Sequence, residues 1–199
     1  MVFEISINSR EWADYIDLPV DEAEQNRILK MIKSVNDPQF KINNCKEIPE
    51  LNGAAFAEHA DFAELNFLAK RIEEISKDKT QICAYRALMS ELPDNICEAI
   101  NNTYGLETIP VYPCEGLEEY GEIVISNDIL EELDGIPYEL YGLLDREKVG
   151  QLMQEREGGM FIEGYYVIPS GYDPVLAYDG IVLPDIDEEN TVEMEVEML

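Results

Sequence analysis

The sequence predicts an α+β protein made of three small domains and an acidic C-terminal tail. Residues 3–7 alternate between apolar and polar types, as a half-buried strand does. Apolar residues between positions 62 and 75 recur at steps of three and four, which is typical of one helix face. Residues 161–168 are rich in the aromatic and β-branched types that favour strands. We expect the following organisation: an α+β domain over 1–60, a helical domain over 61–105, an acidic α+β domain over 106–180 and a tail over 181–199.

The N-terminal domain should contain two strands and one helix. The first strand covers residues 3–7, and the second is expected around residues 40–45. A helix should follow Pro19, because acids at positions 21, 22 and 24 suit the positive end of a helix dipole. Its apolar stripe comprises Ile28, Leu29, Ile32 and Val35.

The central domain should be a compact bundle of three helices joined by short loops. The first helix covers residues 61–76 and the second covers residues 79–90. The third runs from Pro93, a residue type suited to a first helical turn, to about Thr103, shortly before Gly105.

The C-terminal domain should mix short helices with the strand 161–168. We expect helices over residues 115–123, 128–133, 137–144 and 145–157, the last ended by two glycines at 158 and 159. Asp128 and Glu131 have the spacing of a capping box, so they should begin the second of these helices.

Acidic residues greatly outnumber basic ones. The chain has 199 residues, with 43 Asp and Glu against 14 Lys and Arg and a formal net charge of −29. This charge argues against direct binding to nucleic acid or to anionic membranes, whereas 46% hydrophobic residues are enough for a folded core. The excess is uneven, because residues 106–199 hold 24 acids and only 3 bases and carry −21 of the net charge. Ordinary soluble surfaces interleave both signs.

No motif for catalysis, a cofactor or a metal stands out. The chain lacks a glycine-rich phosphate loop and a nucleophile motif, and its single histidine, His59, is expected at an element boundary. The run Asp185-x-Asp187-x-Glu189 copies the start of a calcium loop, but that loop's glycine and final glutamate are replaced by Asn190 and Val196. We therefore expect a protein that is not an enzyme and needs no cofactor or metal.

The cysteines and the termini indicate the cytoplasm. Cys45, Cys83, Cys97 and Cys114 form no C-x-x-C pair and have no histidine pair to complete a zinc site, so free thiols are expected. The sequence shows no signal peptide and no apolar run long enough to span a membrane. Thiols stay reduced in the cytoplasm.

The clearest local pattern is a row of glutamates. Glu115, Glu118, Glu119 and Glu122 are spaced at i, i+3, i+4 and i+7, so they should share one helix face. Side chains at i and i+4 lie about 5–6 Å apart, close to the separation of successive phosphates along a DNA strand. Duplex DNA carries about one charge per 1.7 Å, so a net charge of −29 matches about 50 Å of duplex. These features favour a protein that occupies the basic groove of a DNA-binding protein.

Three other functions fit an acidic chain. A protein from a halophile would spread its acids along the whole length, whereas this chain concentrates them after residue 105. An acidic scaffold or chaperone for basic proteins would need no particular arrangement of the acids. A carboxylate-based hydrolase would depend on one or two of them.

Seven short segments resemble segments of ArdA antirestriction proteins and occur in the same order: residues 16–20, 63–72, 99–106, 112–113, 118–121, 136–140 and 144–150. The segment Ala63–Ile72 resembles the E-[LI]-N-x-L-A start of the family's central helix. Residues 99–121 are similar to its I-N-x-T-x-x-L, Y-x-x-P and E-E-[LY]-G region, and residues 136–150 to its I-P-x-x-L and I-D-Y-E-x-Y-G-R segment. The resemblance covers about residues 1–170.

The resemblance implies an elongated, curved homodimer that imitates bent B-form DNA and occupies the DNA site of type I restriction-modification enzymes in a bacterial host. It also implies no enzymatic activity and no cofactor. Carboxylates would stand in for phosphate oxygens and meet the partner's Lys and Arg as charge-assisted pairs. The candidate partner-binding residues are Glu98, Glu107, Glu115, Glu118, Glu119, Glu122, Asp128, Glu131, Glu132, Asp134 and Glu139.

Two features differ from the family. Val149 and Gln151 stand where the family usually has a Tyr and an Arg, in a segment near its dimer-forming domain, and the chain after Gly180 has no counterpart. A DNA-mimic inhibitor of a CRISPR effector is therefore an alternative, as is the acidic scaffold.

Overall fold

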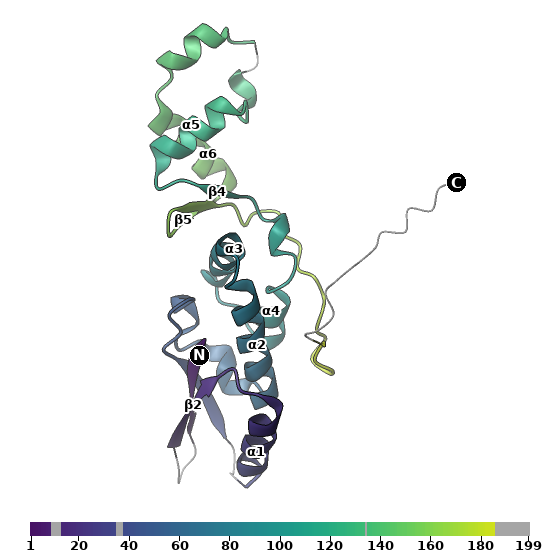
Figure 1. The fold of residues 1–199 in the computed structure, drawn as a ribbon. Coiled ribbons are helices and arrows are strands. Elements are labelled where there is room, and N and C mark those ends of the chain that lie inside the picture. Colours follow the sequence, from purple (N-terminus) through teal and green to yellow (C-terminus); the bar gives the residue numbers. More distant parts are fainter. Residues whose placement is uncertain (9–12, 35–37, 134, 186–199) are drawn as a thin grey trace, which may run out of the picture.

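The computed structural model is an elongated molecule of mixed α+β class, as the sequence predicts (Figure 1). It describes residues 1–8, 13–34, 38–133 and 135–185. A three-stranded antiparallel sheet lies at one end, a group of helices in the middle, and a second three-stranded antiparallel sheet with two further helices at the other end. Most of the predicted tail, residues 186–199, lies outside the described residues.

The first sheet has the strand order β2-β1-β3, and it packs against the central helices. Its strands are β1 (Phe3–Asn8), β2 (Ala13–Leu18) and β3 (Gln39–Asn43). The predictions of β1, of β3 and of α1 (Glu22–Ile32) are confirmed, and Asp21 caps that helix by accepting a 2.8 Å hydrogen bond from the Glu24 amide. The prediction missed β2, an edge strand whose Tyr15 is exposed and whose apolar alternation is weak. Val35 of the predicted stripe lies outside the described residues.

The middle of the chain contains the three predicted helices. They are α2 (Phe62–Ile75), α3 (Lys79–Met89) and α4 (Ile96–Asn101), and short 3₁₀ helices flank them at η1 (Pro49–Leu51), η2 (Ala55–His59) and η3 (Leu106–Thr108). α4 is shorter than predicted because the Asn95 side chain accepts a hydrogen bond from the Glu98 amide and begins the helix there.

The second sheet corrects the prediction of one strand over residues 161–168. That segment is a hairpin of β5 (Met160–Ile162) and β6 (Tyr165–Val167), which turns at Glu163 and Gly164, both at positive φ. β4 (Val111–Pro113), which the sequence did not reveal, pairs with the other side of β6. A three-residue strand carries too few residues for an alternation to be recognised.

Two long helices cover this sheet, and two predicted helices between them prove to be shorter 3₁₀ turns. The long ones are α5 (Leu117–Ser126) and α6 (Arg146–Glu157), and the turns are η4 (Glu131–Leu133) and η5 (Tyr138–Leu143). The expected capping box at Asp128 is wrong, because Asp128 has φ 51° and lies outside any helix. An N-cap residue takes an extended backbone instead.

The buried apolar residues form two clusters. One joins the first sheet to α2, α3 and α4 and also includes Ile162, Val167 and Tyr178 from late in the chain. The other joins α5, α6 and the segment between them to Tyr166 of β6. All four cysteines are free thiols, as predicted, and three of them are buried.

Helices α5 and α6 touch backbone to backbone at two glycines. A Cβ added to Gly121 would lie 1.8 Å from the carbonyl oxygen of Arg146, and one added to Gly150 would lie 2.0 Å from that of Leu117. No side chain fits at either position, so the two glycines set the distance between the helices.

The variant Gly121→Ala should lose about 1–3 kcal/mol of unfolding free energy, measured by urea denaturation, because its methyl group forces the helices apart. Alanine otherwise favours a helix over glycine. The matched control is Gly142→Ala, whose added Cβ meets nothing within 4 Å. Equal stability of the two variants would contradict this account of the helix contact.

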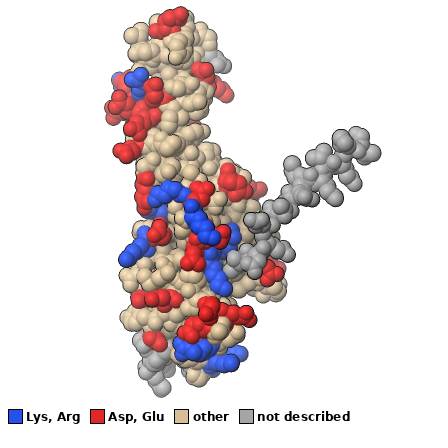
Figure 2. All heavy atoms as spheres, viewed as in Figure 1, with Lys and Arg blue, Asp and Glu red and all other residues tan. Residues whose placement is uncertain are grey.

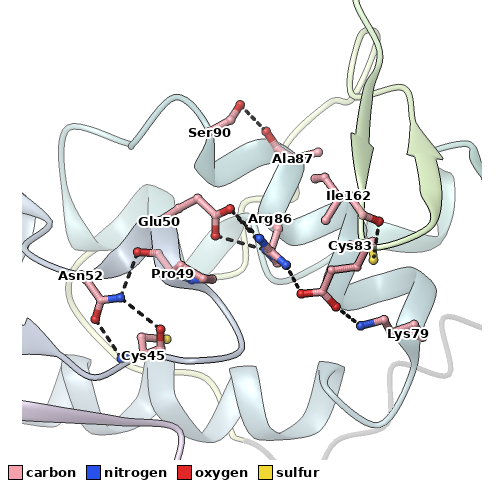
Figure 3. A network of polar contacts seen from close by, with 11 residues as sticks. Cys45, Pro49, Glu50, Asn52, Lys79, Cys83, Arg86, Ala87, Ser90 and Ile162 are labelled. Atoms are coloured by element: carbon pink, nitrogen blue, oxygen red, sulfur yellow. Dashed lines mark hydrogen bonds and ion pairs between the residues drawn. The ribbon is translucent and has the colours of Figure 1, made fainter. Parts of the chain in front are cut away.

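Arg86 on α3 links two distant parts of the chain (Figure 3). Its guanidinium donates to Glu50 of η1 at 3.0 Å and also pairs with Glu163 in the β5–β6 turn. Lys79 pairs with the same Glu163 carboxylate, and its hydrogen bond is the main reason why the pKa of Glu163 lies below its ordinary value. The Arg86 side chain is only 14% exposed, so water screens its pairs less than those of a surface arginine.

Replacing Arg86 with Met should lower the unfolding free energy by about 1–3 kcal/mol, because it leaves the half-buried Glu50 carboxylate without its partner. The control variant Arg27→Met removes an exposed i,i+3 pair with Glu24 and should cost at most about 1 kcal/mol. Urea denaturation of both variants measures the difference. A loss for Arg86→Met no larger than that for the control would refute the proposed link.

Candidate interaction surface

The acidic surface is carried by α5, α6 and the segment that joins them. Tyr120 on the inner side of α5 is fully buried, and its ring centroid lies 3.9 Å from that of Tyr166 on β6. The Tyr120 hydroxyl donates a 2.5 Å hydrogen bond to Glu157 at the end of α6. Leu130 and Leu133 in the joining segment are also buried. These contacts pack one side of each element into the second buried cluster, so the acids on the other side are exposed to solvent.

Three of the four glutamates in the predicted row lie on α5. Glu118, Glu119 and Glu122 are exposed, and Tyr120 and Val124 lie buried on the opposite side. The prediction is wrong for Glu115, because the helix begins only after Gly116. Glu115 instead donates its backbone amide to the Glu119 carboxylate at 2.7 Å. The row therefore continues from the helix into the bend that precedes it.

The other candidate residues are more dispersed. Asp128, Glu131, Glu132 and Glu139 are exposed in the segment between α5 and α6. Glu107 is exposed in η3, and Glu98 is exposed at the start of α4, where it accepts a hydrogen bond from the Asn95 side chain at 3.0 Å. Asp134 lies outside the described residues.

Each of the three bases in residues 106–199 pairs with a nearby acid. Arg146 pairs with Glu122 across the helix crossing, Lys148 pairs with Asp145 at 2.9 Å, and Arg156 binds both carboxylate oxygens of Glu132. The pairs with Arg156 and Lys148 lower the pKa of Glu132 and of Asp145. The sequence did not reveal the partners of Arg146 and Arg156, because each of these pairs joins residues 24 positions apart in the chain. The Lys148–Asp145 pair is local, at i,i+3 spacing.

Several candidate carboxylates are left without a partner. Glu107, Glu115, Glu118 and Glu139 form no side-chain hydrogen bond or ion pair among the described residues. Within the described segments, Asp128 accepts a hydrogen bond from the Tyr141 hydroxyl at 2.9 Å and has no basic partner. Figure 2 shows acidic groups along one edge of the half that holds α5 and α6, and most basic side chains on this face over the centre and the opposite end. The exposed acids of this half are therefore available to a basic partner.

Other kinds of site find little support in the described part of the chain. No group of three or more His, Cys, Asp and Glu side chains is arranged to hold a metal ion there. His59 is exposed at the end of η2, at the element boundary that the sequence predicts. None of the helices in the described segments is both long enough and apolar enough to cross a membrane.

No protein-family model matches this chain, and no curated protein sequence matches it either.

Proposed function

We propose that this protein is a DNA-mimicking inhibitor that occupies the DNA-binding site of a bacterial defence enzyme, with type I restriction-modification enzymes as the first target to test. Its exposed carboxylates take the positions of phosphates and pair with Lys and Arg in the enzyme's DNA groove. The protein works in the host cytoplasm by binding alone, without turnover, cofactor or direct contact with nucleic acid.

One observation carries this proposal: the acids of the α5–α6 half are not neutralised by the chain itself. Each of its three bases pairs with one acid, whereas the exposed carboxylates of Glu115, Glu118 and Glu139 have no hydrogen-bond or ion-pair partner among the described residues. Like charges on neighbouring helix positions cost about 0.2–0.5 kcal/mol each. A basic groove reduces this repulsion. The new ion pairs and the reduced repulsion both make binding more favourable.

The resemblance to ArdA proteins supports the same function and also suggests how the chain is divided into domains. We propose domains over residues 1–60, 61–105 and 106–180, followed by an acidic tail over 181–199. In this arrangement the molecule extends along its target as a duplex would. A CRISPR effector is a second target, since it also holds nucleic acid in a basic channel. An acidic scaffold for basic proteins is the alternative of another class.

We also propose a homodimer that forms through η5. Tyr138 and Leu143 on this turn are 82% and 81% exposed, and η5 lies at the end of the molecule farthest from the first sheet (Figure 1). Large exposed apolar groups of this kind mark contact surfaces. Val149 is buried against α5 and Gln151 bonds Glu155, so neither is an obvious contact in the dimer.

The first prediction from this proposal concerns competition with DNA. The protein should displace duplex DNA from a type I methyltransferase at low salt, and added salt should weaken its binding steeply. Changing Glu115, Glu118 and Glu119 together to Gln should weaken binding about 3- to 150-fold, given about 0.2–1 kcal/mol per exposed pair. A gel competition assay measures both effects.

Two controls make this test specific. The matched variant changes Glu22, Glu47 and Glu58 to Gln, which removes the same charge from exposed positions near the first sheet. A second variant scrambles the acids of residues 115–139 at constant net charge. A scaffold should tolerate the scrambling, whereas a mimic should lose affinity. Failure of the wild-type protein to displace DNA would rule out this enzyme as the target.

The second prediction concerns the dimer. Leu143→Glu should convert a dimer into a monomer, because it places a charge in the apolar contact. Analytical ultracentrifugation measures the mass in solution. Leu92→Glu, at a 44% exposed position on the central part, is the control and should stay dimeric. A wild-type monomer would contradict the dimer without affecting the proposed mimicry.

A further inference from the structure

The chain beyond the second sheet runs back along the central helices. Residues 169–185, which we call the strap, contain no helix or strand and pass beside α4 (Figure 1). Tyr178 lies in the middle of the strap and is 4% exposed. Tyr178 belongs to the same buried cluster as residues of the central helices, although it lies far from those helices in the sequence.

Buried polar contacts fix the backbone of the strap. Asn101 on α4 is 6% exposed, and its amide nitrogen donates to the Tyr178 carbonyl at 2.9 Å. Its amide oxygen accepts from the backbone amides of Ala177 and Tyr178 at 3.0 and 2.8 Å. The Tyr178 hydroxyl donates to Glu64 on α2 at 2.8 Å. Hydrogen bonds from side chains therefore satisfy backbone groups of the strap that would pair with a neighbouring strand in a sheet.

The fixed strap presents large apolar side chains to solvent on both sides of Tyr178. Val175 and Leu176 are 42% and 79% exposed, and Ile181 and Val182 are 81% and 74% exposed. Scattered apolar residues are normal on a surface, but four within eight residues indicate a contact site. The strap also carries exposed acids at Asp173, Asp179 and Asp185, and it contains no Lys or Arg.

We propose that the strap is a second contact with the target enzyme, docking into an apolar groove bordered by Lys and Arg. This inference rests on the proposed function, in which the partner is basic. The acids of the strap favour such a rim and disfavour a second copy of this chain, whose strap would bring acids against acids. Because Asn101 and Tyr178 already order the backbone, docking loses little conformational entropy.

The strap gives the inhibitor a selectivity that carboxylates alone do not supply. A row of carboxylates attracts any basic DNA groove, since phosphate contacts carry no sequence information. Apolar side chains add affinity only for a partner with a complementary groove. The affinity gained from burying them is insensitive to moderate salt. The two contacts therefore differ in a way that can be measured.

The test compares affinity for the type I methyltransferase across a series of salt concentrations. The double variant Leu176→Ser and Ile181→Ser should bind about tenfold or more weakly at every salt concentration, with an unchanged slope of log affinity against log salt. The carboxylate variant of Glu115, Glu118 and Glu119 should instead flatten that slope. The control variant Leu92→Ser should bind as the wild type does. Urea denaturation checks that the strap variants keep wild-type stability.

Three outcomes would overturn the inference. An unchanged affinity of the double variant refutes the strap contact while leaving the mimicry intact. If the double variant has a lower mass in solution than the wild type by ultracentrifugation, the strap contacts a second copy of the chain instead. No binding by the wild-type protein rules out the type I methyltransferase as the target and overturns this inference with it. A stable strap variant is expected, because Leu176 and Ile181 are 79% and 81% exposed. If the variant unfolds, Val182→Ser provides the same comparison at a single 74% exposed position.

Discussion

The backbone contact between α5 and α6 at Gly121 and Gly150 sets the geometry of the acidic half of this protein. It brings Arg146 at the start of one helix to Glu122 on the other, and it turns the inner sides of both helices onto Tyr166. The outer sides carry exposed acids together with Arg146, Lys148 and Arg156, each of which is paired with an acid. If either glycine carried a side chain, the helices would separate, and the pairing of the few bases would change with them.

The pairing of these bases matters because the acids around them far outnumber them. An acidic surface costs free energy through self-repulsion, and proteins usually relieve it by interleaving both signs. In the part of α5, α6 and their connection that the structure describes, basic side chains pair with Glu122, Glu132 and Asp145. The buried aromatic and leucine contacts of the second cluster offset the remaining repulsion. Retaining so many unpaired charges suits a protein whose partner supplies the opposite sign, which is the basis of the function we propose.

Polar contacts of two central helices tie this half to the rest of the chain. Arg86 on α3 binds Glu163 in the β5–β6 turn and Glu50 near the first sheet, and Asn101 on α4 binds the backbone around Tyr178. Both connections use a central helix as the fixed support. Both links join segments that are far apart in the sequence, so they contribute to keeping the two ends of the molecule in a defined relation.

Local pattern was enough to predict several elements. Helices α2 and α3 have long apolar stripes, and β1 alternates cleanly, so periodicity identified them. Strands β2 and β4 were missed because an edge strand and a three-residue strand carry little periodicity, and the hairpin at Glu163 was mistaken for one strand because both arms are apolar. Asp128 misled the prediction because its spacing to Glu131 matches a capping box, while its backbone is left-handed.

The amino-acid sequence by itself determined the α+β class, the concentration of acids after residue 105 and the exposed row on α5, since each follows from composition or from spacing along the chain. Only the tertiary structure decided which acids are neutralised, because Arg146 and Arg156 reach Glu122 and Glu132 across 24 residues of chain. The same holds for the strap, whose exposed apolar side chains become visible only once Asn101 has fixed its backbone on α4. Contacts between distant residues depend on how elements pack, and no local pattern records that.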